Sequence, residues 1–307
     1  MRTSSKKVSL LDLLSVPNQD PVSVQKAVLE GRDVNETSLY GFTPLMFATI
    51  LNDDIDIVRT LIENGAAIDA ETQDGMTPLM WSLLTETQDH TANDLPTAME
   101  KERRRRTVAM ELIERGANVN AQCCLPRWSR WTPLLFATLE PDLNASIISA
   151  LIKAGAKVDA ETEDGVTPLI HAASRGRNSD AVLALLQAGA NVDMAGKQEG
   201  REGWTPLLYA LSSPYKSLSI VKELVTHDAE VNIVARGGRT PLLLATTLGN
   251  NPAFVQLLLD AGADVLLHDD DGNSALDYAK AKQYTRVSRL LFQAENFRKT
   301  AKRIFAY

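Results

Sequence analysis

Residues 164–173 read DGVTPLIHAA, and this short stretch combines a turn with the start of a helix. Thr167 is a favourable N-cap residue, and Pro168 fits the first helical turn, where its missing N–H removes no hydrogen bond. Asp164 and Gly165 before it form a pair that is typical of hairpin turns. The stretch therefore predicts a turn followed by a helix that begins at Thr167.

The same phrase recurs through the chain at a nearly constant spacing. Thr-Pro-Leu occurs six times, and a degenerate copy places a serine in the seventh slot; the copies begin at Thr43, Thr77, Thr132, Thr167, Thr205, Thr240 and Ser274. The intervals between them are 34, 55, 35, 38, 35 and 34 residues. Self-similarity at a period of this length indicates a repeat architecture.

Each copy continues into a second apolar segment. In residues 54–65 apolar side chains recur at helical spacing from Ile57 to Ile62, and Gly65 ends the segment as a C-terminal glycine does. Gly-Ala marks this end at Gly65, Gly116, Gly155, Gly189 and Gly262, and Asp228 takes the missing slot. Two short helices and a turn cannot bury their apolar faces alone, whereas a stack of such units forms a continuous core.

The phrases DGMTPLM (74–80), DGVTPLIHAA (164–173) and LLLDAGADV (257–265) closely resemble the ankyrin repeat family. The resemblance covers roughly residues 20–295 and implies an all-α fold, an ankyrin-repeat solenoid with short β-hairpin fingers. It predicts an N-terminal capping unit over 1–38, a repeat array over 39–297 and a basic helical tail over 298–307. The family often has His after Thr-Pro-Leu; this chain has Met46, Met80, Leu135, Ile170, Leu208, Leu243 and Asp277 there. We therefore expect apolar packing at this slot.

The composition limits the class of protein. The chain has 307 residues, 44% of them hydrophobic and 23% charged, which is enough apolar content for a packed core. Its net charge of −7 argues against nucleic-acid binding, and no apolar run approaches the ~18 residues of a membrane span. The two cysteines are adjacent and suit a reducing compartment. We expect a cytoplasmic monomer that binds another protein, and neither nucleic acid nor membrane.

Two of the stretches between Gly-Ala and the next Thr, which we call fingers, are longer than the others. The gap is 12 residues at four junctions but 16 from Gly116 to Thr132 and from Gly189 to Thr205. We call residues 117–131 the first long finger and residues 190–204 the second. Trp and Arg are enriched among interface hot spots, so we predict protein contacts at Arg127, Trp128, Arg130, Trp131 and Trp204.

These tryptophans have different alternatives. Trp131 and Trp204 come directly before a helix, where the slot is often bulky, so packing against neighbouring fingers is an equal alternative for both. Nothing in the repeat pattern requires Trp128. We therefore expect Trp128 to be an exposed partner contact, whose removal changes the stability by roughly 0.5 kcal/mol or less.

A column of aromatic residues lies two places after Thr-Pro-Leu. In the resembled family this slot faces the concave groove, and the resemblance therefore implies a second contact surface. The column reads Phe47, Trp81, Phe136, His171, Tyr209, Leu244 and Tyr278, and we predict protein contacts at the first five. The alternative is that these rings pack between adjacent helices and are mostly buried.

The second repeat contains an insertion between its two helices. From Thr77 to Gly116 there are 39 residues, against 22 from Thr43 to Gly65. Residues 93–116 can form one long helix, with Asp94 as its cap. The run Arg103–Arg106 can be a nuclear-import signal or a contact for an acidic partner, but we favour a solvated helix whose glutamates offset the arginines.

No group of residues points to catalysis. The four histidines fall in different repeats without metal-ligand spacing, and no phosphate loop or nucleophile elbow is present. We expect no catalytic, cofactor-binding or metal-binding residue, and a non-enzymatic scaffold or adaptor that contacts its partner through finger tips and the concave groove. Two alternatives remain: a thiol-based redox sensor that uses Cys123 and Cys124, and a secreted or host-targeted effector.

Overall fold

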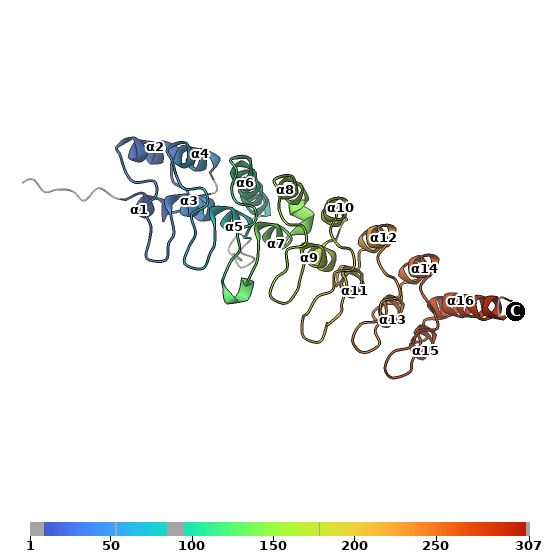
Figure 1. The fold of residues 1–307 in the computed structure, drawn as a ribbon. Coiled ribbons are helices and arrows are strands. Elements are labelled where there is room, and N and C mark those ends of the chain that lie inside the picture. The colour runs from blue at the N-terminus through green and yellow to red at the C-terminus, as the bar shows by residue number, and fades with distance from the viewer. Residues whose placement is uncertain (1–8, 53, 85–94, 178, 305–307) are drawn as a thin grey trace, which may run out of the picture. The chain divides into compact units, whose positions relative to one another are not determined.

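The computed structural model describes residues 9–52, 54–84, 95–177 and 179–304. These residues form helices and no strands, apart from two isolated bridges, Ala235–Arg239 and His268–Ser274 (Figure 1). The prediction of an all-α fold is confirmed. The fingers are loops closed by a few backbone hydrogen bonds, so strand pairing in them is a minor feature.

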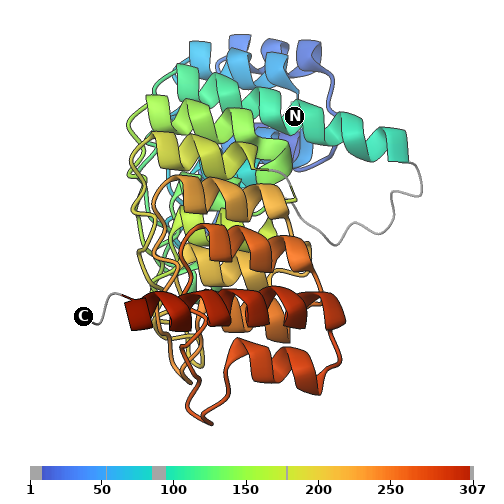
Figure 2. The ribbon, with the colours of Figure 1, turned by 90° about the vertical axis from the view of Figure 1, so that its right-hand side faces the viewer.

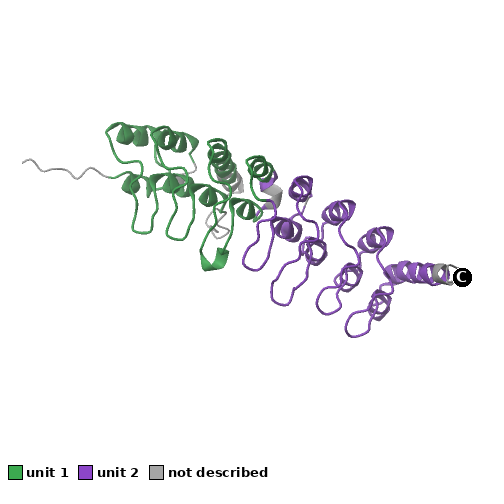
Figure 3. Ribbon diagram, viewed as in Figure 1, with its two compact units in different colours: residues 1–139, 146–157 green, residues 140–145, 158–307 purple. Residues whose placement is uncertain are grey.

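The chain divides into two compact units (Figure 3). Unit 1 contains residues 1–139 and 146–157, and unit 2 contains residues 140–145 and 158–307. Both are built from helix pairs in which a first helix follows a finger and a second helix runs back. No helix of the described ranges is both long and apolar enough to cross a membrane.

Unit 1 holds the N-terminal pairs. Its first helices are α1 (Leu10–Leu14), α3 (Pro44–Phe47), α5 (Pro78–Leu83) and α7 (Pro133–Ala137), and α3 continues into the π-helix η1 (Ala48–Asn52). Its second helices are α2 (Pro21–Leu29), α4 (Ile55–Glu63), α6 (Leu95–Glu114) and most of α8 (Pro141–Lys153). Successive first helices pack on one another, and so do α2, α4 and α6.

Unit 2 repeats this arrangement. Its first helices are α9 (Pro168–Arg175), α11 (Pro206–Ser212), α13 (Pro241–Thr247) and α15 (Ala275–Ala281). Its second helices are α10 (Asp180–Gln187), α12 (Leu218–Thr226), α14 (Pro252–Asp260) and α16 (Thr285–Ile304), and Figure 2 shows them, yellow to red, stacked one above another. Because α16 passes residue 298 without a break, the helix has no boundary where the basic tail was predicted to begin.

The threonine before each proline begins the first helix. Thr43, Thr77, Thr132, Thr167 and Thr240 each accept a hydrogen bond from the backbone N–H three residues on, and Ser274 forms a capping box with Asp277. These bonds satisfy amides that have no partner inside the helix. Thr205 is the exception, because its buried Oγ1 has no partner among the described residues.

The residue after Thr-Pro-Leu packs in the core, as predicted. Met46 and Met80 are fully buried, and Leu135, Ile170, Leu208 and Leu243 are at most 3% exposed. The leucine of each Thr-Pro-Leu is equally buried from Leu45 to Leu242. At this position, apolar contact between consecutive first helices therefore takes the place of the polar interactions that a histidine would make.

Polar side chains connect each finger to the following turn. The Asn35 amide donates to the Gly65 carbonyl (2.9 Å) and accepts from the Ala67 N–H (2.7 Å). Asn120 makes the same pair of bonds, to the Gly155 carbonyl (2.9 Å) and from the Lys157 N–H (2.8 Å). Asn232 repeats them in unit 2, at 3.3 and 2.7 Å. These ties fix the register of neighbouring repeats within each unit.

The inserted segment of the second repeat ends in α6, which confirms a long helix over residues 95–114. The predicted cap Asp94 lies outside the described residues. Glu100 forms ion pairs with Arg103 (2.7 Å) and Arg104 (3.2 Å), and their hydrogen bonds lower the pKa of Glu100 to about 2. This pairing agrees with a solvated helix in which glutamate offsets arginine.

Candidate protein-binding surfaces

The first long finger is a closed loop docked on the preceding finger. The Cys123 N–H donates to the Trp131 carbonyl (2.9 Å), and the Arg130 N–H donates back to the Cys123 carbonyl (2.9 Å). The Cys124 N–H donates to the carbonyl of Asp74 in the preceding finger (2.8 Å). A 3₁₀ turn, η2 (Pro126–Trp128), forms the tip. The base of this finger is therefore held in place, and the tip residues are presented from it.

Three aromatic rings pack together below this tip. Phe136 of α7 is fully buried. The ring of Trp128 meets it edge-on, with 5.5 Å between centroids, and the ring of Trp131 lies 5.2 Å away. Trp128 and Trp131 are each half-buried. The expectation that Trp128 is exposed and outside the fold is wrong, because its ring covers Phe136.

The exposed part of the tip is cationic. The side chains of Arg127 and Arg130 are exposed, and the Arg127 guanidinium lies 5.3 Å from the centroid of the Trp128 ring. A guanidinium over an indole face keeps its donors free for a carboxylate while the ring holds it in place. The tip therefore presents two arginines and the exposed part of the Trp128 side chain to solvent.

Arg130 has a left-handed backbone, with φ of 64°. In the other six copies of the repeat the residue two places before the helix cap is glycine, at Gly41, Gly75, Gly165, Gly203, Gly238 and Gly272, with φ between 66 and 82°. A non-glycine residue costs about 1–2 kcal/mol in this conformation. The first long finger thus keeps an arginine where all other copies use the unstrained residue.

The second long finger has the same backbone pattern but a different surface. The Gly196 N–H donates to the Trp204 carbonyl (2.9 Å), and the Lys197 N–H reaches the Asp164 carbonyl (2.8 Å). Trp204 and Tyr209 are only 2% and 3% exposed, and their rings meet edge-on at 5.4 Å. For Trp204 the structure supports the packing alternative, and neither its ring nor that of Tyr209 is an exposed contact at the finger tip.

The predicted aromatic column is not exposed along its whole length either. Phe136 and Tyr209 are buried because the bulky residue before each cap covers them. Phe47 and Trp81 are half-buried, and both lie near Phe42, at 5.5 and 5.4 Å. His171 is half-buried as well. The five rings do not form one accessible strip, which leaves Phe47, Trp81 and His171 as candidate contacts.

The two cysteines are both free thiols. Cys123 is buried, and burial raises the pKa of its thiol above the ordinary value, whereas Cys124 is exposed. A reactive or redox-sensing cysteine requires a lowered pKa. The shift at Cys123 has the opposite sign and gives no support to the thiol-based alternative.

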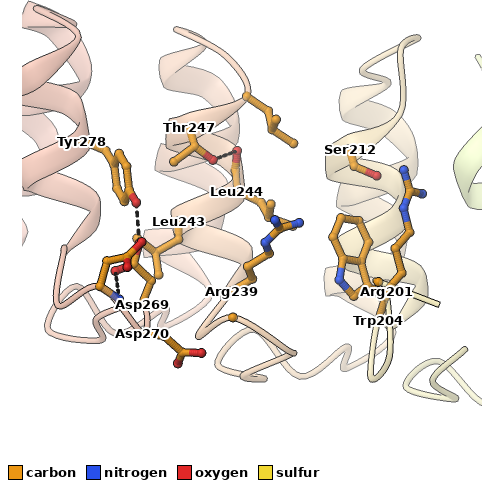
Figure 4. Close-up of a pocket in the computed structure, with 14 residues that line it drawn as sticks. Arg201, Trp204, Ser212, Arg239, Leu243, Leu244, Thr247, Asp269, Asp270 and Tyr278 are labelled. Atoms are coloured by element: carbon orange, nitrogen blue, oxygen red, sulfur yellow. Dashed lines mark hydrogen bonds between the residues drawn. The ribbon is translucent and has the colours of Figure 1, made fainter. Parts of the chain in front are cut away.

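A pocket in unit 2 was not foreseen from the sequence. It has a volume of about 640 Å³ and is lined by residues of three consecutive repeats (Figure 4). In Figure 4 Arg201, Trp204 and Arg239 stand on one side of it, and Asp269 and Asp270 stand on the other. Asp271 also lines the pocket. The sequence holds one signal of this pocket: among the residues that directly precede a helix cap, Arg239 is the one cation. Among the described residues no cluster of His, Cys, Asp and Glu has the arrangement of a metal site.

Comparison with known proteins agrees with this geometry. The family model described as ankyrin repeats (3 copies) matches in overlapping segments at residues 13–92, 98–196, 144–235, 191–269 and 208–302. The crystal structure of the human ASB11 ankyrin repeat domain has a TM-score of 0.60 and 25% identity, and covers 82% of this chain and 98% of that one.

Two sequence relatives differ widely in how much of their own length the match covers. The Escherichia coli ankyrin repeat protein YahD is 32% identical over 157 residues, 50% of this chain and 72% of its own length. Human neurogenic locus notch homolog protein 2 is 31% identical over 178 residues, 53% of this chain, and the match spans 7% of its length. With the family model matching nearly the whole array, the chain belongs to the ankyrin repeat family.

Proposed function

We propose that this chain is a scaffold or adaptor that binds a partner protein through the tip of the first long finger. Its family supports a role in protein–protein interaction in general. The observation that supports this site is the left-handed backbone of Arg130. This exposed arginine stands in the one finger that lacks the usual glycine. Strain of this kind persists where the side chain is needed, so an observed outlier points to function.

The charge of the tip defines the partner. Arg127 and Arg130 are exposed beside the free face of Trp128, whereas the chain as a whole carries a net charge of −7. A segment with one or two carboxylates next to an apolar side chain complements this surface, with the carboxylates on the guanidinium groups and the apolar group on the indole. An acidic partner segment is attracted to this finger and repelled by the acidic remainder of the chain, so charge directs it to the finger.

A peptide library displayed on phage tests this proposal. Peptides selected on the wild-type protein are expected to carry acidic residues, and the double variant Arg127→Ala/Arg130→Ala is expected to bind them about tenfold or more weakly, which is 1.4 kcal/mol. Arg103→Ala/Arg104→Ala is the matched control, because it removes the same charge from α6. Equal losses in both variants would show a bulk charge effect, and no loss in either would place the contact elsewhere.

A further inference from the structure

The pocket of unit 2 has two walls of opposite charge. Arg201 lies 4.8 Å from the centroid of the Trp204 ring, and Arg239 lies 5.9 Å from the same centroid. Neither arginine forms an ion pair with another described residue. In Figure 4 the Trp204 ring stands between the two guanidinium groups, and both arginine side chains are exposed. Each unpaired guanidinium attracts a carboxylate. This wall is therefore a site for a carboxylate.

The facing wall carries three consecutive aspartates. Asp269 is committed to the fold, because it accepts from the Tyr278 hydroxyl (2.5 Å) and from the backbone N–H of Asn273 (2.9 Å). Asp270 and Asp271 are exposed, and within the described ranges their carboxylates have no cationic partner. Figure 4 shows Asp269 and Asp270 beside α15, across the pocket from Arg239 and Trp204. This wall is available to a cationic side chain.

An unpartnered donor belongs to the arginine wall of the pocket. Trp204 is 2% exposed, and its indole Nε1 has no hydrogen-bond acceptor among the described residues. In Figure 4 the indole nitrogen lies on the side of the ring nearer to α13. Leu243 and Leu244 contribute an apolar floor from that helix. A carbonyl or carboxylate oxygen bound on the α13 side of the ring, next to Arg239, provides the acceptor that Nε1 lacks.

We infer that this pocket binds an extended peptide segment of a partner protein, with acidic residues on Arg201 and Arg239 and a basic residue on Asp270 and Asp271. Arg201, Arg239 and Asp270 belong to three consecutive repeats. Helices of adjacent repeats are ~8–10 Å apart, and an extended chain advances ~3.3 Å per residue, so about three residues separate each charge of the peptide from the next. Apolar residues between them lie on Leu243 and Leu244. The volume of about 640 Å³ is typical of ligand sites. The inference rests on the proposed function only in taking a protein as the partner, and it adds a second contact site.

The test uses a synthetic fluorescein-labelled peptide, Gly-Glu-Ser-Ser-Glu-Leu-Leu-Lys-Lys-Gly, and the whole chain. Two control peptides carry only Glu or only Lys at the four charged positions. Fluorescence anisotropy is expected to show tighter binding of the mixed peptide than of either control. Arg201→Glu/Arg239→Glu is expected to weaken the mixed peptide about tenfold or more and to make the all-Lys peptide the preferred ligand, because repulsion replaces attraction at one wall. The α6 variant Arg103→Ala/Arg104→Ala, which lies outside both proposed contact sites, is expected to leave the affinity for the mixed peptide unchanged.

The indole N–H resonances of the four tryptophans locate the peptide independently. On ¹⁵N-labelled protein, the Trp204 resonance is expected to move on addition of the mixed peptide, since Nε1 gains an acceptor, while those of Trp128 and Trp131 stay in place. Movement of the Trp128 resonance alone would overturn the pocket assignment and leave the proposed finger contact standing. Absence of binding at millimolar peptide, or binding that ignores the Arg201 and Arg239 changes, would also overturn it.

Discussion

At the residue scale, residues that occupy the same position of the repeat differ in burial because their neighbours differ. Trp131 and Trp204 precede their helix caps by one residue, yet Trp204 is 2% exposed and Trp131 is half-buried. Likewise, the left-handed position is glycine in six copies of the repeat and Arg130 in one. The contact that we propose therefore lies at a departure from the repeat.

Trp128→Ala tests the packing of the finger tip on α7. Full burial of a tryptophan gives a loss of ~3–5 kcal/mol on truncation. Because Trp128 is half-buried against Phe136, we expect a loss of about 2 kcal/mol in the free energy of unfolding, measured by urea denaturation. Arg127→Ala on the same turn is the control, with an expected change within about 0.5 kcal/mol. Equal effects of the two changes would argue against the Trp128–Phe136 contact.

Gly238→Ala tests how closely the last fingers approach each other. A Cβ at Gly238 would lie 2.5 Å from the Asp269 Cα, and the residue has a φ of 66°. We expect a loss of about 2–4 kcal/mol, from backbone strain and overpacking together. Gly272→Ala has the same strain but meets nothing within 4 Å, so a loss of about 1–2 kcal/mol is expected. Chemical denaturation of both variants measures the difference, which would vanish if the fingers did not touch.

At the element scale, the sequence predicted helix starts well because capping is local. The Thr-Pro phrase contains both the cap and the first turn, so the starts of the first helices needed no tertiary information. The long α6 followed likewise from an uninterrupted helical stretch. Burial of Phe136 and Tyr209 could not be predicted in this way, since it depends on how the residue before the cap folds over the helix. The charged pocket, which combines side chains from three repeats, was missed for the same reason.

Two threonines provide a matched test of capping. Thr167 accepts from the Ile170 N–H at 3.2 Å, whereas Thr205 makes no such bond, and both are fully buried. We expect Thr167→Ala to cost about 1 kcal/mol of unfolding free energy and Thr205→Ala to cost less. Thermal unfolding of both variants measures this order. The reverse order would show that the Thr205 hydroxyl has a partner in solution.

Glu111 of α6 clamps two second helices in unit 1. It is 8% exposed and accepts from Arg59 of α4 at 2.8 and 3.0 Å and from Arg115 at 3.0 Å. The hydrogen bond from Arg59 lowers the pKa of Glu111 below its ordinary value of 4.5. A lowered folded-state pKa means that the stabilisation is present above pH 4.5 and is lost as the pH falls further.

Glu111→Gln is therefore expected to destabilise the protein by about 1.5–3 kcal/mol at pH 7, the range for hydrogen bonds to charged groups. The difference from the wild type is expected to shrink as the pH falls below 4.5. Urea denaturation of both proteins at pH 7 and at pH 3.5 measures it. A difference that stays constant with pH would show that packing, and not the carboxylate charge, is lost in the variant.

At the scale of the whole molecule, the chain combines an acidic total charge with arginines gathered at irregular fingers. The net charge is −7, yet Arg127 and Arg130 stand on the first long finger and Arg201 on the second. The period of the repeats predicted the family and the register of the array. It could not predict which fingers contact a partner protein. The repeated positions are those that form the helical stack, whereas the exposed tips differ from copy to copy.

The central claim is that Arg130 is retained for binding despite the strain on its backbone, and Arg130→Gly tests it most directly. Asp228→Gly is the matched control, since Asp228 also stands in a glycine slot, with φ of 64°. Thermal unfolding and calorimetric titration with a library-selected acidic peptide are measured on both variants. We expect both to keep or raise the unfolding free energy by up to about 1 kcal/mol, and only Arg130→Gly to bind about tenfold more weakly. Unchanged affinity in Arg130→Gly would contradict the account.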